Sequence, residues 1–370
     1  MNFPPCPQPP DWKIDWTTLD AFPWISDLKG CPQNPERHAE GDVWIHVHGG
    51  CEAMAALPAW RQLPQDERQI LFTGGLLHDV AKPACTRIDP DGAISSRGHS
   101  WRGAVRARQI LWRRGMPFAQ REQVSALVRH HLVPFFLADS EDPKRLAIEV
   151  SQSARCDWLS ILAESDARGR TCPNPDQLLS QIAMFRKQCE DLGCLTGPFS
   201  FPSNHARFLY FRDPGRQPDS PAEEEFSCDV IMMSGLPGAG KDHWIRKYAG
   251  TREIISLDAL RIELGVAPSD PQGLVVNRAR ELAREHLRTG KPFVWNATNL
   301  SRHVRNECVR LFHEFRAKVR IVYVEASPDR LFSQNRQRRR KVPDSVIERL
   351  LDRWEVPDRT EAHQVDWIVS

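Results

Sequence analysis

The stretch GLPGAGKDHW, residues 235–244, combines closely spaced glycines with a lysine, which suits the binding of phosphate groups. Gly235, Gly238 and Gly240 allow successive backbone N–H groups to face phosphate oxygens, and Lys241 can neutralise the β- and γ-phosphates of a nucleotide. The stretch follows the apolar run DVIMMSG and precedes a helical pattern, which is the context expected of a P-loop. We therefore predict that this region binds ATP or another NTP together with Mg²⁺.

Asp242 follows the lysine at a position where a Ser or Thr hydroxyl normally binds Mg²⁺. An ionised carboxylate brings negative charge close to the phosphates, which is unfavourable unless a cation lies between them. As a hard oxygen ligand, Asp242 can hold Mg²⁺ directly or through a bound water. A different interpretation is a decayed P-loop, which would bind a nucleotide without turning it over, as in a sensing or tethering module.

An acidic and a basic side chain follow the apolar run REIIS. Asp258 lies just past this predicted strand, at the sheet edge where α/β proteins bind ligands, and Arg261 follows one helical turn later. An acid there can take the proton from an attacking hydroxyl during phosphoryl transfer. The later stretch NRQRRRKVP is either a solvated helix face or a lid that supplies arginines to the transition state. Its basic residues are Arg336, Arg338, Arg339, Arg340 and Lys341.

Imidazole and carboxylate groups recur through the first half of the chain. His78 and Asp79 are adjacent in a helical run, LLHDVAKP, and Lys82 lies one turn further on. Adjacent side chains of a helix point about 100° apart, so this pair alone does not define a site. Together with other His and Asp residues, however, it suits Mn, Fe, Co, Ni or Zn better than Mg alone. The further candidates are His46, His99, His130, His131 and Asp166.

The elements that carry these motifs change in type at about residue 200. Segments such as ERQILFTGGLLHDVAK and REQVSALVRHHLVPFFL place apolar residues three and four apart, so residues 1–200 are predicted to be all-α. Residues 201–226 are rich in Pro and charge, which predicts a linker. In residues 227–370 short apolar runs alternate with helical stretches, which predicts an α/β domain with a central parallel sheet.

The composition restricts the class of protein. The chain has 370 residues, which favours two domains, and 50 Lys+Arg against 48 Asp+Glu give a formal net charge of +2. Contacts with nucleic acid would therefore have to come from local basic patches. The ten cysteines form no CxxC pair, the first residues lack the pattern of a secretory signal, and no apolar run reaches the ~18 residues of a membrane span. We expect a cytoplasmic protein with reduced thiols and no membrane partner.

The C-terminal motifs resemble those of the 5′-hydroxyl polynucleotide kinases. GxPGxGK, an Asp with Arg three residues later, NATNLS and an Arg-rich segment ending in VP occur in this order over residues 226–370. The resemblance implies that Asp258 is the general base and that Arg261 holds a phosphate of the acceptor strand. It assigns lid roles to Arg336 and Arg338.

The chain departs from this kinase pattern at two positions. Asp242 replaces the Ser or Thr that the family commonly has, and Ala297 precedes TNL where the phage enzyme has an acidic residue. The second departure leaves Asn299 as the polar group that we expect near the substrate.

The order H, HD, GH, HH and D in the first half is similar to that of the HD phosphohydrolase superfamily. GHSWRGA, VRHH and ESDARGR are especially like HD domains attached to tRNA nucleotidyltransferases. The resemblance implies a metal-bound water or hydroxide that attacks phosphorus, with Lys82 stabilising the developing charge. His38 and His48 are spare candidates for which structural roles are favoured. The implied ligands are His46, His78, Asp79 and Asp166 for one metal, with Asp79 bridging to a second held by His99 and the His130/His131 pair.

The two motif sets together resemble HD-Pnk, a family of bifunctional enzymes that make broken RNA or DNA ends ligatable. The resemblance implies NTP-dependent phosphorylation of 5′-hydroxyl ends. It also implies metal-dependent removal of a 2′,3′-cyclic phosphate, a 2′-phosphate or a 3′-phosphate. The implied partners are RNA or DNA ends, and a nucleic-acid ligase that joins the healed ends would be a natural further partner.

A different class of enzyme also fits these motifs. An HD nucleotidase or cyclic-nucleotide phosphodiesterase joined to a kinase for a small metabolite would use the same P-loop and the same metal ligands. The arginines favour an acceptor that carries phosphate, but small metabolites can carry phosphate too. Dependence of the kinase activity on oligonucleotide length separates the two interpretations.

Overall fold

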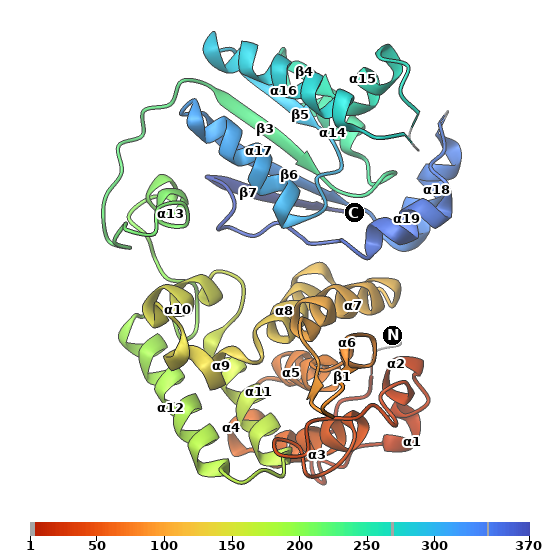
Figure 1. Cartoon of the computed structure of the whole chain (residues 1–370), viewed down its shortest axis with the longest axis vertical. Coiled ribbons are helices and arrows are strands. Elements are labelled where there is room, and N and C mark those ends of the chain that lie inside the picture. The colour runs from red at the N-terminus through yellow and green to blue at the C-terminus, as the bar shows by residue number, and fades with distance from the viewer. Residues whose placement is uncertain (1–3, 268–269, 339) are drawn as a thin grey trace. The chain divides into compact units, whose positions relative to one another are not determined.

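The computed structural model describes residues 4–267, 270–338 and 340–370. The chain forms two compact units, and the boundary between them falls between Ser200 and Phe201. Figure 1 shows a first unit made largely of helices and a second unit built on a sheet. The predicted fold class, an all-α region followed by an α/β region with a parallel sheet, is confirmed.

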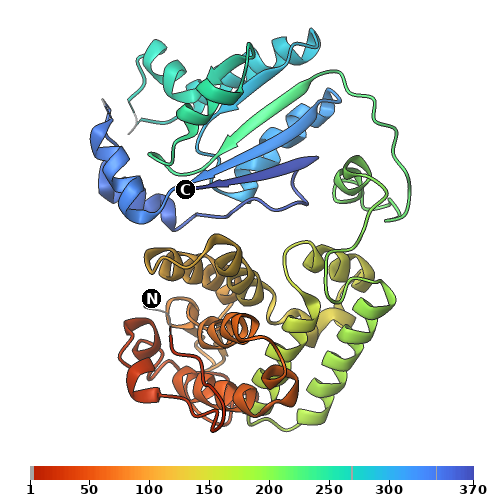
Figure 2. The ribbon, with the colours of Figure 1, turned by 180° about the vertical axis from the view of Figure 1, so that it is seen from behind.

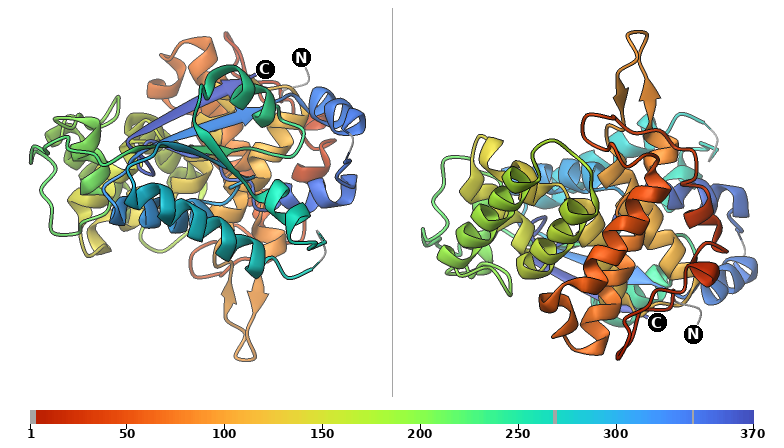
Figure 3. Two further views of the ribbon diagram at one scale, coloured as in Figure 1. Left: turned by 90° about the horizontal axis from the view of Figure 1, so that it is seen from above. Right: turned by 90° about the horizontal axis from the view of Figure 1, so that it is seen from below.

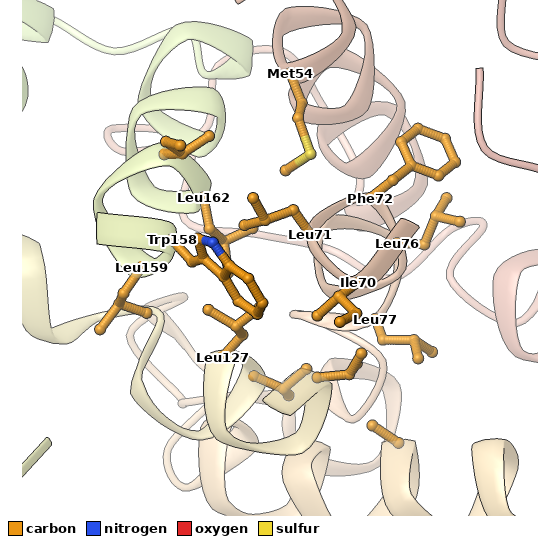
Figure 4. Close-up of a cluster of buried hydrophobic side chains, with 14 of the residues drawn as sticks. Met54, Ile70, Leu71, Phe72, Leu76, Leu77, Leu127, Trp158, Leu159 and Leu162 are labelled. Atoms are coloured by element: carbon orange, nitrogen blue, oxygen red, sulfur yellow. The ribbon is translucent and has the colours of Figure 1, made fainter. Parts of the chain in front are cut away.

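The core of the first unit lies between helices whose apolar residues recur at helical spacing. Leu71, Leu127 and Leu162 come from three of these helices and are buried in one cluster (Figure 4). Burying a Leu side chain contributes about 1.5–3 kcal/mol relative to leaving it exposed, so this cluster holds the helices in place. The helices of the core include α3 (Val43–Ala56), α5 (Gln65–Leu77), α8 (Phe118–His130) and α11 (Cys156–Gly169).

Shorter elements complete the first unit. A hairpin of β1 (Arg87–Ile88) and β2 (Ile94–Ser95) projects from the helices, as Figure 3 shows. Helical periodicity did not indicate this hairpin, because each of its strands has only two residues. The other elements are α1 (Trp16–Leu19), α2 (Pro23–Ser26), α4 (Pro58–Arg61), α6 (Lys82–Cys85), α7 (His99–Arg113), α9 (Val133–Phe136), the 3₁₀ helix η1 (Leu137–Asp139), α10 (Pro143–Ser151) and α12 (Pro175–Asp191).

Helices α3 and α11 approach each other at glycines. A Cβ atom on Gly169 would lie 2.2 Å from the backbone nitrogen of Gly50, and one on Gly49 would lie 2.8 Å from the carbonyl oxygen of Gly169. Only residues without a side chain fit at this contact. The close approach brings His46 of α3 within reach of Asp166 of α11.

The second unit is built on five parallel strands in the order β4-β5-β3-β6-β7. The central strand β3 pairs with both β5 and β6, and it is a nearly continuous apolar run because all but its first residue are buried. Figure 2 shows the C-terminus of the chain at the end of the edge strand β7. The strands are β3 (Asp229–Ser234), β4 (Glu253–Ser256), β5 (Phe293–Asn296), β6 (Lys318–Glu325) and β7 (Gln364–Val369).

Helices connect the strands of the second unit. Ser256 and Ser301 cap two of them, since their hydroxyls accept from the backbone N–H groups of Ala259 and Val304. Within the described parts of the chain, no helix has the length and apolar character that crossing a membrane requires. The helices are α13 (Asn204–Tyr210), α14 (Lys241–Tyr248), α15 (Leu257–Glu263), α16 (Gly273–Arg288), α17 (Arg302–Glu314), α18 (Pro328–Gln337) and α19 (Asp344–Leu351).

The segment 201–226, predicted as a linker, begins with a helix of the second unit. Helix α13 buries Phe208 in the core of that unit, and Arg207 Nη2 donates to the carbonyl oxygen of His363 at 2.9 Å. The helix has only seven residues, so its apolar spacing does not stand out among the prolines and charges around it.

Candidate functional site

Six of the predicted metal ligands come together in the first unit. The sequence suggested that His78 and Asp79 lie inside a helix. In the structure α5 ends at Leu77, and the two residues lie in a turn before α6. In this turn both side chains face the same point, since His78 Nε2 lies 3.3 Å from Asp79 Oδ2. The six residues are His46, His78, Asp79, His99, His131 and Asp166.

Each imidazole of this cluster is anchored through its Nδ1 atom. His78, His99 and His131 contact backbone carbonyl oxygens three residues earlier in the chain, at 2.7, 2.7 and 2.8 Å. His46 Nδ1 lies 2.9 Å from Glu40 Oε1. Because these partners only accept hydrogen bonds, each Nδ1 must donate, so in the neutral imidazole Nε2 has the lone pair that ligates metals.

The four Nε2 atoms approach one another in pairs. His46 Nε2 lies 3.3 Å from His78 Nε2, and His99 Nε2 lies 3.2 Å from His131 Nε2. Asp79 contacts both pairs, because its Oδ2 is 3.7 Å from His46 Nε2 and its Oδ1 is 3.4 Å from His99 Nε2. Lone pairs at such distances repel each other unless a proton or a cation lies between them.

The donor set fits metal ions. Among the groups of three residues whose ligand atoms lie within 4.8 Å of one another, two share Asp79. Oδ1 of Asp79 is buried and accepts no hydrogen bond from the residues that the structure describes. A buried unpaired oxygen among imidazole lone pairs is an environment for a cation, and mixed nitrogen and oxygen donors suit Mn, Fe, Co, Ni or Zn. The two groups are His46–His78–Asp79 and Asp79–His99–His131.

Lys82 is buried beside the shared carboxylate. Its Nζ lies 2.7 Å from Asp79 Oδ2, which makes an ion pair, although the angle is not that of a hydrogen bond. Nζ donates instead to Gln33 Oε1 at 2.6 Å. The ammonium group therefore lies next to the candidate metal ligands, where its predicted role is to stabilise negative charge.

Neighbouring charges keep the two carboxylates of the cluster ionised. Burial alone would raise the pKa of Asp79, but Lys82 and His78 outweigh it and hold that pKa well below its usual range. Burial would also raise the pKa of Asp166, but Arg170, whose Nη2 donates to both carboxylate oxygens, helps to hold it well below its usual range. Both side chains thus have the charge that metal ligation requires.

The imidazoles of the cluster differ in their affinity for protons. Burial would lower the pKa of His78, but the adjacent Asp79 raises that pKa overall. Burial lowers the pKa of His131 to about 3, and a positive charge on His78 adds to the effect. A proton on His78 therefore competes with a metal, and metal binding is expected to release it.

Glu40 holds His46 in place, and sequence analysis did not identify it. Its Oε1 accepts from Nδ1 of both His38 and His46 at 2.9 Å, and its Oε2 accepts from the backbone N–H of Thr171 at 2.8 Å. By keeping the proton of His46 on Nδ1, this carboxylate leaves Nε2 available as a ligand. The only signal in the sequence was its position between two histidines.

Two candidate histidines lie outside the cluster. His130 Nε2 is 3.2 Å from Ser153 Oγ, whereas its neighbour His131 enters the cluster, because adjacent residues at a helix end point in different directions. His48 stacks on Trp16 with ring centroids 3.4 Å apart, which agrees with the structural role expected of it. Of the predicted pair, His131 is thus the residue placed to bind a metal.

A cavity of about 470 Å³ opens onto the cluster, with Asp79 and His131 in its wall. Arg37 and Arg97 also line it and are exposed. Phe136 lines it too and is 45% exposed. Side-chain atoms that can bind a metal, guanidinium groups and an exposed aromatic ring together suit a phosphate ester attached to a nucleobase.

The glycines of the second unit form the predicted loop between β3 and α14. Gly235, Gly238 and Gly240 have φ values of +141°, +85° and +104°, which favour glycine. A Cβ atom on Gly235 would lie 2.2 Å from the carbonyl oxygen of Val324 on β6. The loop therefore lies against β6 and leads into the N-terminus of α14, where backbone N–H groups lack intrahelical partners.

Lys241 begins α14 and turns back to its own loop. Its Nζ donates to the carbonyl oxygens of Gly235 at 2.8 Å and Leu236 at 3.0 Å. Burial lowers the pKa of Lys241 to about 8, although the carboxylate of Asp242 opposes this shift. Phosphate oxygens would replace the two carbonyl oxygens when a nucleotide binds.

The predicted general base lies at the carboxyl end of the sheet. Asp258 follows β4 as the second residue of α15, and its side chain is 72% exposed. It pairs with Arg261, whose Nε donates to Gln272 Oε1 at 2.8 Å. Arg338 Nη2 lies 4.0 Å from Asp258 Oδ2. Two guanidinium groups beside one carboxylate form a surface that suits an anionic acceptor.

The Arg-rich segment begins in the last turn of α18 and precedes α19. Asn335 joins the two ends of this segment. Its side chain donates to the carbonyl oxygen of Val342 at 2.7 Å and accepts from the N–H of Val342 at 3.1 Å. Arg336 is exposed in the last turn of α18, whereas Arg338 approaches Asp258. Arg339, predicted as part of this segment, lies outside the described residues.

The polar residues that follow β5 differ from expectation. Asn299 is buried, and its Nδ2 donates to the carbonyl oxygen of Met233 at 2.7 Å, so it ties this loop to β3 rather than facing a substrate. Asn296, the last residue of β5, makes the exposed polar contact near the P-loop instead. Its Nδ2 donates to Asp242 Oδ1 at 3.0 Å.

One curated protein similar to part of the chain is the bifunctional uridylyltransferase/uridylyl-removing enzyme of Rhodopseudomonas palustris. It is 33% identical over 115 residues, which is 30% of this chain. The match spans 11% of the length of that relative.

A family match lies in the second unit, and two similar solved structures each cover about two fifths of this chain. A candidate kinase from Chloroflexus aurantiacus J-10-fl is 17% identical, with 39% of this chain and 86% of that chain covered at a TM-score of 0.33. A gluconokinase from Sinorhizobium meliloti 1021 is 19% identical, with 39% and 84% covered at a TM-score of 0.29. The family described as AAA domain matches residues 230–357. With its glycine loop and parallel sheet, the second unit is an α/β domain of the P-loop type.

Proposed function

We propose that this protein heals broken RNA or DNA ends, with one reaction in each unit. The second unit would transfer the γ-phosphate of an NTP to a 5′-hydroxyl. The first would remove a 2′,3′-cyclic phosphate, a 2′-phosphate or a 3′-phosphate. The observation that carries the proposal is that one chain combines a P-loop with a carboxylate, Asp79, shared by two imidazole groups. One damaged break requires both reactions before a ligase can seal it.

In the kinase reaction, Asp258 would accept the proton of the 5′-hydroxyl. The hydroxyl oxygen forms a bond to the γ-phosphorus while the bond from that phosphorus to the bridging oxygen of ADP breaks. Lys241 would neutralise the phosphates, and Arg261 would hold a phosphodiester of the acceptor strand, next to the carboxylate with which it pairs. Mg²⁺, when bound, supplies charge that offsets the phosphates, and Asp242 would hold it.

In the phosphoesterase reaction, a divalent transition metal held by the cluster would supply an activated water and would polarise the phosphoryl oxygens. Lys82 would add positive charge beside the developing oxyanion, and Glu40 would keep His46 in the ligating tautomer. The residues that would hold metal are His46, His78, Asp79 and Asp166 on one side, with His99 and His131 on the other.

The cavity supports a nucleotide as the substrate of the first unit. Arg37 and Arg97 can pair with backbone phosphates, and Phe136 offers a face on which a base can stack. Together these observations favour nucleotide ends over small phosphate esters.

The test uses an RNA oligonucleotide with a 5′-hydroxyl and a 2′,3′-cyclic phosphate, incubated with ATP and Mg²⁺, Mn²⁺ or Ni²⁺. Wild type is expected to phosphorylate the 5′ end and to clear the 3′ end. Lys241→Ala should lose only the first reaction and Asp79→Ala only the second. If neither end changes while free nucleotides or small phosphate esters are turned over, the end-healing proposal is wrong.

A second candidate is a nucleotidase or cyclic-nucleotide phosphodiesterase joined to a kinase for a small metabolite. The openness of the acceptor site at Asp258 does not by itself favour a polymer. Kinase rates measured on 5′-hydroxyl acceptors from a nucleoside to a long oligonucleotide distinguish the candidates. Rates that rise with length support end healing, and rates that are highest for a small phosphorylated acceptor support the metabolite kinase.

A further inference from the structure

The hydrogen bond between Asp242 and Asn296 joins two positions that matter for metal binding. Asp242 is the residue after the P-loop lysine, and Asn296 ends β5, the strand that runs parallel to β3 and beside it. The carboxyl ends of neighbouring parallel strands meet at one edge of the sheet. Both side chains therefore lie where the phosphates of a nucleotide, and the cation bound to them, are expected.

In P-loop nucleotide-binding proteins, Mg²⁺ is commonly held by a neutral Ser or Thr hydroxyl of the loop and by an Asp elsewhere. In this protein the loop position carries the acid, and the residue that pairs with it from the adjacent strand is a neutral amide. We propose that the two ligand types have exchanged places, so that Asp242 supplies the charged ligand of Mg²⁺ and Asn296 orients it.

The geometry of the pair supports this exchange. A carboxylate can only accept, so Asn296 must direct its NH₂ group toward Asp242 Oδ1, at 3.0 Å. That bond leaves Oδ2 of Asp242 and Oδ1 of Asn296 with lone pairs for a hard cation or its bound waters. The site keeps one negative charge, as a pair made of Ser and Asp would.

The exchange has a consequence for nucleotide binding without metal. A carboxylate at the loop position repels the phosphates whenever no cation separates them, whereas a serine hydroxyl there does not. Binding of the nucleotide should therefore depend on Mg²⁺ more strongly than in a protein with serine at this position. This inference rests on the kinase part of the proposed function and concerns only the nucleotide, not the acceptor.

The experiment measures the affinity of full-length protein for a non-hydrolysable ATP analogue by calorimetry, in excess EDTA and in excess Mg²⁺. In EDTA, Asp242→Ser is expected to bind the analogue about tenfold more tightly than wild type. The factor by which Mg²⁺ increases its affinity for the analogue, the Mg²⁺ stimulation, should be about tenfold smaller than in wild type. The double variant Asp242→Ser with Asn296→Asp should recover most of the stimulation, because it restores one acid in the site. Asp229→Ser, at the opposite end of β3, removes the same charge and should change neither affinity.

The outcomes separate this inference from the proposed end-healing activity. If Asp242→Ser binds no tighter in EDTA and keeps the wild-type stimulation, Asp242 is not the metal ligand. If the double variant behaves like the single one, Asn296 is not its partner position. If no variant binds the analogue, the inference and the kinase proposal both fail. Failure to phosphorylate nucleic acid, with nucleotide binding as predicted, would overturn only the end-healing proposal.

Discussion

The two candidate sites differ in how much of their geometry exists before a ligand binds. In the first unit the side chain of Asp79 is 1% exposed, and His46 and His131 are each anchored through Nδ1. In the second unit the side chain of Asp258 is 72% exposed, and Lys241 donates to carbonyl oxygens of its own loop. The first site is assembled in advance, whereas the second must exchange its own contacts for those of its ligands.

This difference corresponds to the ligands that we propose for each site. The imidazole lone pairs of the first site face one another beside a buried carboxylate and repel unless a cation lies between them, so this site suits an ion that stays bound. A nucleotide and an acceptor strand must enter and leave in every turnover, so their site has to be accessible. In this protein the buried carboxylates and imidazoles accompany the proposed resident ion, and the exposed acid Asp258 accompanies the ligands that exchange.

Removing the shared carboxylate, Asp79, should produce the largest difference between the activities of the two sites. Asp79→Asn keeps the shape of the side chain but removes the charge, and we expect phosphoesterase activity to fall at least about 1000-fold. Kinase activity of the same preparation should stay within a factor of about two, because the P-loop belongs to the other unit. Thermal unfolding of the variant shows whether the first unit still folds, and a loss of less than about tenfold in a folded variant would contradict the prediction.

Loosening an anchor of the first site should have a smaller effect. Glu40→Gln removes the charge that holds the imidazole of His46, and we expect Mn²⁺ affinity to fall by about 10- to 100-fold. Calorimetric titration of metal-free protein without nucleotide measures this loss. Glu52→Gln is the matched control, since Glu52 accepts a hydrogen bond from Trp16 outside the cluster. Equal losses in both variants would rule out a positioning role for Glu40.

The exposed aromatic ring of the first unit tests whether its substrate carries a base. Phe136→Ala should lower kcat/KM for a nucleotide 3′ end about tenfold, because stacking on one base contributes about 1–3 kcal/mol. Phe136→Trp should retain the activity. A ribose cyclic phosphate without a base provides the comparison substrate, and its turnover should be the same in all three proteins. A parallel decrease for both substrates would point to a structural role of the ring.

The open site should respond to pH through its lysine. Lys241 has a pKa of about 8 in the nucleotide-free loop, and only the protonated ammonium pairs with phosphates. Above pH 8 binding therefore requires uptake of a proton, and the affinity for the ATP analogue should fall about fivefold between pH 8 and pH 9. Calorimetry at the two pH values measures it. Lys241→Arg stays charged and should lose this dependence, so an unchanged pH profile in that variant would exclude the lysine as its cause.

Much of the arrangement could be predicted because it depends on local patterns. Apolar residues at helical spacing identified the helices of the first unit, and alternating apolar runs identified the strands of the second. The order of His and Asp residues identified the six side chains of the cluster that includes Asp79. Each of these patterns can be recognised in a single sequence.

Contacts between distant residues could not be predicted in the same way. Glu40 and Thr171 are 131 residues apart, and Asp242 and Asn296 are 54 residues apart. The choice of His131 over His130 depends on where α8 ends, which no residue type determines by itself. Such pairings exist only once the helices and strands are in register.

The glycine contact between α3 and α11 makes the dimensions of the first site depend on a single carbon atom. His46 and Asp166 lie within a turn of these glycines, and the 3.1 Å between His46 Nε2 and Asp166 Oδ1 requires the two backbones to touch. A methyl group at Gly169 would push the helices apart by on the order of an ångström while leaving every ligand in the sequence. The coordination geometry therefore depends on the absence of side chains at these glycines. A relative could retain all six ligand residues and still be unable to bring them together.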